Sequence, residues 1–185
     1  MRRIRGISSF AVALATIGLA HTASAQQVVV AASPSAEDVG VDRAGGSIAA
    51  ILGFGAHSGA GFGLGVEGGY TLPMHLYLGG NLTYFTGSDS VTSYIFEGQV
   101  GYDLGIIKAA PILIRPYVGI GYQNFTASAF GVSVSAGGAV ITPGVVGTYF
   151  ITPHIFAGAD IRLDYSTSSA GGGIFDLFAT GGYKF

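Results

Sequence analysis

The sequence contains no cysteine and no tryptophan, and it holds few charged residues. Without cysteine there is no disulfide framework, no thiolate nucleophile and no site for lipoprotein acylation. Charged residues make up 10% of the chain, whereas an ordinary soluble domain has roughly 25%. This shortage argues against a soluble enzyme. The small number of basic residues after the first five positions also argues against nucleic-acid binding, which needs a clustered basic surface.

Long apolar runs are missing as well once the first 25 residues are passed. A membrane-spanning helix needs about 20 consecutive apolar residues, and the later sequence offers none. Hydrophobic residues nevertheless make up 49% of the chain, and 32 residues are glycine. Apolar residues diluted by Gly, Ser, Thr and Tyr are expected where apolar and small or polar positions alternate.

The first 25 residues have the three parts of a secretory signal peptide. A positively charged start precedes an apolar stretch, Ile7–Ala20, which is short for a membrane anchor. An A-x-A cleavage site, with Ala23 and Ala25, places the mature start at Gln26. We therefore expect three parts: a cleaved signal peptide (1–25), a flexible periplasmic leader (26–45) and one barrel domain (46–185).

From Gly46 onward the hydrophobic pattern has a period of two, which indicates β-strands with two different faces. Polar or proline-containing connections divide it into eight segments: Gly46–His57, Gly61–Leu72, His75–Thr86, Tyr94–Leu104, Leu113–Phe125, Ser135–Thr152, Ile155–Tyr165 and Gly173–Phe185. We expect loops at 58–60, 87–93, 126–134 and 166–172, and a bulge at Pro143. The fold class is all-β: an eight-stranded antiparallel up-and-down transmembrane β-barrel, whose even strand number places both ends on one side of the membrane.

The apolar face is expected to lie outside, against lipid. The opposite face has too few charges to coat a soluble surface, and the rest of it is mainly Gly, Tyr, Phe, Thr and Gln. Eight strands leave an interior just wide enough for side chains to fill, so glycines would make room for lumen aromatics. On the outer face, Tyr and Phe residues gather near both ends of the segments, as in the two aromatic girdles of membrane barrels.

The final segment ends with Tyr183 and Phe185 on one face. This ending resembles the C-terminal signal by which the outer-membrane insertion machinery recognises barrels. With the signal peptide and the eight alternating segments, the chain resembles the OmpA/OmpX-like outer-membrane β-barrel superfamily, also called porin-family proteins. The resemblance implies a location in the Gram-negative outer membrane, contact with its lipid and lipopolysaccharide, periplasmic chaperones and insertion by the barrel-assembly machinery. We expect a monomer.

Five charged residues are candidate site residues, because they fall on the lumen face of the predicted barrel: Glu67, Glu97, Arg115, Asp160 and Arg162. One hypothesis is a structural network of ion pairs that stabilises a filled interior. The other is a charged constriction in a narrow, weakly cation-preferring water path, since acids outnumber bases in the lumen. The predicted function is therefore a structural or narrow passive-permeability role.

The sequence offers two alternative functions. His57-Ser58 could suggest a lipid A-modifying hydrolase, but no third group that could orient the histidine is expected within reach. Surface adhesion is the other alternative, although the expected loops are short and offer few aromatic or arginine anchors. The Gly-x-Gly spacings lie inside period-two segments with no following helix, so they do not indicate a phosphate loop. We expect no enzymatic activity, no cofactor and no metal site.

Overall fold

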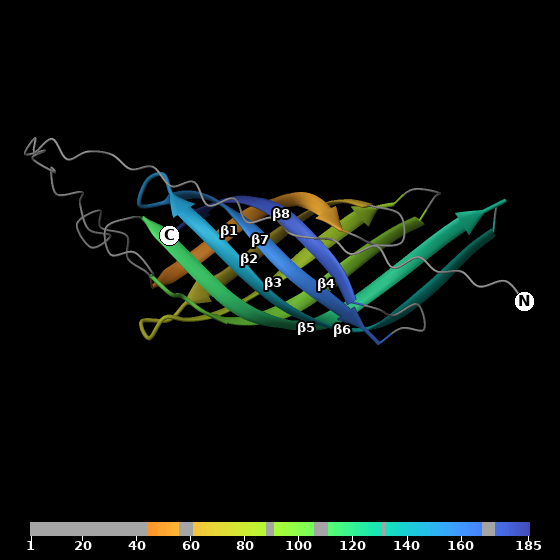
Figure 1. The fold of residues 1–185 in the computed structure, drawn as a ribbon, viewed down its shortest axis with the longest axis horizontal. Coiled ribbons are helices and arrows are strands. Elements are labelled where there is room, and N and C mark those ends of the chain that lie inside the picture. Colours follow the sequence, from red (N-terminus) through yellow and green to blue (C-terminus); the bar gives the residue numbers. More distant parts are fainter. Residues whose placement is uncertain (1–43, 56–60, 88–90, 106–110, 131, 168–172) are drawn as a thin grey trace, which may run out of the picture. The chain divides into compact units, whose positions relative to one another are not determined.

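The computed structural model describes residues 44–55, 61–87, 91–105, 111–130, 132–167 and 173–185. Eight antiparallel strands pair in sequence order, and the last pairs with the first to close a barrel (Figure 1). Their bounds are β1 Gly45–Gly55, β2 Gly61–Thr71, β3 Leu76–Thr86, β4 Val91–Tyr102, β5 Ile112–Ala129, β6 Val132–Phe150, β7 Ile155–Ser166 and β8 Gly173–Lys184. Within the described ranges, no helix is long and apolar enough to cross a membrane. The predicted fold class is confirmed.

The register of the strands determines how the sheet closes. Directly paired residues can be followed once around the barrel, from Gly45 on β1 through each strand in turn and back to Gly55, ten residues from the start. The residues on this path are Thr71, Tyr77, Gly101, Tyr117, Gly144, Arg162 and Asp176. This offset of ten residues is the shear number of the barrel. It requires strands that tilt by roughly 35–45° from the barrel axis.

The two faces of each strand differ as the sequence pattern predicts. Leucine, isoleucine, valine, tyrosine and phenylalanine side chains are exposed on the outer face, for example Leu64, Ile120 and Ile161. The aromatic residues expected in the two girdles lie on this outer face and are exposed, including Tyr70 and Tyr183 near the turns and Tyr84 and Tyr165 near the loops. A closed barrel with an apolar exterior satisfies its backbone hydrogen bonds internally, and it can therefore span a bilayer.

Glycines in the lumen make room for large side chains on neighbouring strands. The ring of Tyr77 occupies the space where Gly69 and Gly79 would carry a Cβ atom, and the ring of Tyr117 does the same at Gly144. Tyr77 and Tyr117 are buried, as are Phe85, Phe156 and Phe178, while Phe125 is half-buried. Five of these six lumen aromatics are therefore buried.

The expected loop at 126–134 is wrong. β5 continues into it as an 18-residue strand that ends at Ala129, and β6 begins in it, at Val132, as a 19-residue strand. Phe130, directly after β5, has a positive φ of 51°, which suits a hairpin turn. Ser, Ala and Gly in this segment indicated a loop, but they alternate with Thr and Val in strand order. β6 pairs with β7 only as far as Val140, so the hairpin extends beyond its neighbour (Figure 1).

Other boundaries also differ from the prediction. Val91–Ser93, expected in a loop, belong to β4. Pro143 does not mark a bulge, because the β5–β6 and β6–β7 registers are the same on both sides of it. The β6–β7 pairing merely skips Thr142 and Pro143, since proline has no N–H to donate. Strand ends otherwise shift by a few residues, and β1 begins at Gly45, one residue before the expected start.

A pair of glycine substitutions tests the packing of the lumen wall. A Cβ at Gly53 would collide with the backbone and ring of Phe178, whereas a Cβ at Gly147 would meet nothing within 4 Å. We expect Gly53→Ala to lower the free energy of unfolding by about 1–3 kcal/mol through overpacking. Gly147→Ala should leave it unchanged or slightly higher. Urea titration followed by gel mobility would measure both, and equal effects would contradict the proposed packing.

Candidate functional site

Every charged side chain in the described ranges belongs to the lumen face of the barrel. These residues are Glu67, Glu97, Asp103, Arg115, Asp160, Arg162, Asp164, Asp176 and Lys184. The outer face is therefore free of charge along the described strands. Burying charge is costly unless it is paired or hydrogen-bonded, so the contacts of these nine residues decide how the interior is held together.

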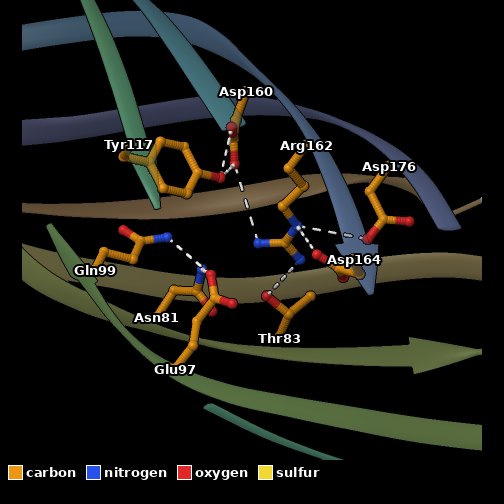
Figure 2. A network of polar contacts seen from close by, with 9 residues as sticks. All are labelled: Asn81, Thr83, Glu97, Gln99, Tyr117, Asp160, Arg162, Asp164 and Asp176. Atoms are coloured by element: carbon orange, nitrogen blue, oxygen red, sulfur yellow. Dashed lines mark hydrogen bonds and ion pairs between the residues drawn. The ribbon is translucent and has the colours of Figure 1, made fainter. Parts of the chain in front are cut away.

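Arg162 on β7 is the centre of the largest group of contacts, and it is 1% exposed. Its guanidinium group approaches three carboxylates, at 4.0 Å from Asp160, 3.8 Å from Asp164 and 3.5 Å from Asp176 (Figure 2). It also donates a hydrogen bond to Thr83 across the lumen at 3.2 Å. One cation thus serves three acids from two neighbouring strands.

Aromatic residues complete the surroundings of Arg162. The guanidinium lies over the ring of Phe178, 4.4 Å from its centroid, a favourable cation–π position. The hydroxyl of Tyr117 donates to the carboxylate of Asp160, 3.0 and 3.1 Å from its two oxygens. Tyr117 comes from β5, so this bond links two strands that are not paired with each other, because β6 lies between them.

Glu97 on β4 is held by amides rather than by a cation. The side-chain nitrogens of Asn81 and Gln99 donate to Oε1 of Glu97 at 2.7 and 2.9 Å (Figure 2). Oε2 has no hydrogen-bond partner among the described residues. Gly119 on β5 leaves the space that this carboxylate occupies, because a Cβ there would come within 2.8 Å of it.

A second cluster lies near the turn end of the barrel. Arg115 donates to both oxygens of Asp103, with Nε–Oδ1 at 2.5 Å and Nη2–Oδ2 at 3.1 Å. Thr71 donates to Asp103 at 2.9 Å, and the guanidinium stacks 3.6 Å from the ring centroid of Tyr77. Glu67, which is half-buried, lines a cavity of about 20 Å³ beside Arg115. Such a cavity holds about one water molecule.

The five predicted site residues therefore do not form one network. Asp160 and Arg162 come together, whereas Arg115 lies in the separate cluster with Asp103, and Glu97 is bonded to amides. Sequence reasoning omitted Asp103, Asp164 and Asp176 from the candidate site, although all three lie on the lumen face. The signal was present for Asp164, because it is two residues from Arg162 and therefore on the same face of one strand.

Apolar clusters enclose the polar groups. Phe85 and Phe178 pack edge to face at 5.8 Å in the loop half of the lumen, together with Ile51, Ile95 and Val140. In the turn half, Phe150 and Phe156 pack at 5.8 Å beside Ala49 and Leu113. The lumen is thus filled with side chains rather than lined by them. Among the described residues, no group of three or more His, Cys, Asp or Glu side chains could hold a metal ion.

The C-terminal residues have a structural place in the closed sheet. Tyr183 and Phe185 are exposed on the outer face. The backbone of Phe185 exchanges two hydrogen bonds with Gly46, both at 2.9 Å. His154 stacks on Tyr183 with ring centroids 5.5 Å apart. The cleavage-site residues Ala23 and Ala25, and the His57-Ser58 pair, lie outside the described residues.

Removing the central cation should destabilise the barrel. Arg162→Met leaves three buried carboxylates without their cation, which should cost about 3–5 kcal/mol of folding free energy. Arg115→Met affects one carboxylate and a partly exposed side chain, so we expect a smaller loss. Adding Asp164→Asn and Asp176→Asn to Arg162→Met should recover part of the stability. Urea unfolding of the folded barrel measures each variant, and no recovery in the triple variant would contradict an electrostatic cause.

Comparison with known proteins finds no matching family model and no matching curated protein. Solved structures match in fold over nearly their whole length. Neisserial surface protein A aligns with a TM-score of 0.63 and 15% identity, covering 78% of this chain and 98% of that one. The N-terminal β-barrel domain of Pseudomonas aeruginosa OprF aligns with a TM-score of 0.59 and 18% identity, covering 77% of this chain and 99% of that domain. A major outer membrane protein from Thermus thermophilus aligns with a TM-score of 0.58 and 15% identity, covering 77% of this chain and 99% of that protein. The chain therefore has the fold of the small eight-stranded outer-membrane β-barrels, the fold implied by its resemblance to the OmpA/OmpX-like superfamily.

Proposed function

We propose that this chain is an integral outer-membrane barrel with a closed lumen, whose role is structural rather than conductive. The observation that carries the proposal is the buried position of Arg162. It is enclosed by three carboxylates, Thr83 and the ring of Phe178. A filled interior of this kind stabilises the sheet against collapse and leaves little room for water.

The outer-membrane location is supported by three features together. The outer face is apolar between its two rows of aromatic residues, the shared fold includes an outer-membrane protein, and the sequence begins with a signal peptide pattern. With this location, the contacts are membrane lipid and lipopolysaccharide, and assembly would use periplasmic chaperones and the barrel-assembly machinery. The proposed protein is a monomer with a short periplasmic leader, no cofactor and no enzymatic activity.

The alternative of a narrow, weakly cation-preferring path leads to a direct experiment. Purified, refolded wild-type barrel in a planar lipid bilayer should show no conductance steps. The double variant Arg162→Ser/Phe178→Ala removes the central plug and should give small steps. These steps should prefer cations, because six acids then face two bases in the described lumen. Steps of equal size from the wild type would refute the closed lumen.

Surface adhesion is favoured by one specific observation. Phe130, at the tip of the β5–β6 hairpin, is fully exposed, and Val132 beside it is 65% exposed. Exposed aromatic residues are the anchors that dominate interfaces, and the sequence analysis expected few of them in the loops. If the chain is an adhesin, Phe130→Ser should reduce host-cell binding about tenfold, as expected for one lost anchor. Binding by the wild type that is unchanged in this variant would contradict a role for the tip.

A further inference from the structure

The outer face of the barrel changes its chemistry abruptly near the loop end. Tyr84 on β3 pairs with Tyr94 on β4, and both rings are exposed on the lipid side. Two residues further towards the loops, the paired positions hold hydroxyl groups instead. They form one row across four strands, which consists of Thr86, Thr92, Thr126 and Ser135. Ser128 and Ser133 form a second pair above it. We call these six residues the hydroxyl patch.

Contacts within the hydroxyl patch connect neighbouring strands. The hydroxyls of Thr126 and Ser135 are 3.0 Å apart, and those of Ser128 and Ser133 are 2.9 Å apart. Thr86 donates to the carbonyl oxygen of Phe62 at 3.3 Å. A hydroxyl can donate one hydrogen bond and accept two, so each pair keeps capacity for further partners on its exposed side.

The hydroxyl groups are confined to one face of the hairpin. On the opposite face, the same stretch of β5 and β6 carries Ala127, Val132, Val134 and Ala136. A random placement of serine and threonine in this segment would put them on both faces. Only the face that continues the lipid-facing surface is polar.

Charge is absent from the β5–β6 hairpin beyond Arg115. From Pro116 to Ala159 the sequence contains no Asp, Glu, Lys or Arg. An ordinary soluble domain has roughly 25% charged residues, and recognition of phosphate relies on Arg or Lys. The described part of this face has neither, so its recognition chemistry is limited to hydroxyl, amide and backbone hydrogen bonds.

These observations together point to one class of partner. The hydroxyl patch begins directly beyond the aromatic row, which marks the level where acyl chains end and headgroups begin. We propose that the hydroxyl patch binds the oligosaccharide headgroups of outer-leaflet glycolipid through uncharged hydrogen bonds, without contacts to the lipid phosphates. The proposal rests on the outer-membrane location in the proposed function. It specifies which part of the glycolipid is recognised and that β3, β4, β5 and β6 recognise it.

The test uses the whole mature protein in vesicles of three compositions. One contains phosphatidylcholine only, one adds lipopolysaccharide with a complete core oligosaccharide, and one adds lipid A, which keeps the phosphates and lacks the core sugars. Hydrogen exchange of residues 124–139 is the readout. The complete glycolipid should slow exchange by about tenfold relative to lipid A, the effect of one or two added hydrogen bonds. The protection should persist in EDTA and in high salt, because no ionic contact is involved.

Matched variants separate the two faces of the hairpin. Thr92→Val/Thr126→Val removes hydroxyls from the hydroxyl patch at constant shape and should abolish the added protection. Val132→Thr/Val134→Thr places hydroxyls on the opposite face and should retain it. Protection by lipid A equal to that by the complete glycolipid, loss in EDTA, or full protection of the first variant would each overturn the proposal.

One further measurement distinguishes failure of the inference from failure of the proposed location. All variants should show a mobility shift on heating and slow exchange in the barrel strands in each vesicle type, because the sheet is unchanged. If these signs of insertion are present while the sugars add no protection, the glycolipid inference is wrong and the membrane location stands. If insertion itself fails in the wild type, the location is wrong and the inference falls with it.

Discussion

Strands in a lipid bilayer must find a partner for every backbone N–H and C=O group, because no water is present to bond them. This chain meets the requirement by pairing β8 with β1, so that the sheet has no open edge within its apolar belt. The N–H of Phe185 donates to the carbonyl of Gly46, and the N–H of Gly46 donates to the carbonyl of Phe185. The Phe185 ring also covers Gly46, where a Cβ would collide with it. A residue typical of a sorting signal therefore also takes part in closing the barrel.

Closure with eight strands and a shear of ten then fixes the width of the lumen. The interior is too narrow for a broad channel and too wide for alanine alone, which explains the alternation of glycine with large rings on facing strands. The same narrow space forces the buried charges together. Arg162 lies beside carboxylates on its own strand β7 and on the paired strand β8, and it reaches a threonine on β3 because β3 lies across the narrow lumen. The polar cluster is thus a consequence of the barrel geometry, and its contacts also stabilise that geometry.

The sequence was informative wherever one physical rule dominated. The period of two, maintained because lipid lies on one side and a packed lumen on the other, predicted eight strands and the orientation of nearly every side chain. It failed at 126–134, where the hairpin leaves the lipid and the apolar face is no longer the outer one. The period of two also did not predict which side chains would pair. The face of Arg115 could be predicted, but its pairing with Asp103 rather than with Asp160 depends on register between strands, which alternation alone does not specify.

The segment 126–134, where the predicted loop was wrong, also shows how the outer face of the barrel changes along β5 and β6. Within the bilayer the outer face of β5 and β6 carries Val118, Ile120 and Ile141, and beyond Tyr122 the same face carries Thr126, Ser128 and Ser135. Beside a layer of sugars, hydroxyl groups on the lipid-facing side meet sugar hydroxyls at headgroup depth, whereas the valines lie on the opposite face of the hairpin. The outer face therefore changes from apolar to hydroxyl-bearing where its surroundings change from acyl chains to an uncharged polar layer. This boundary lies at the aromatic row.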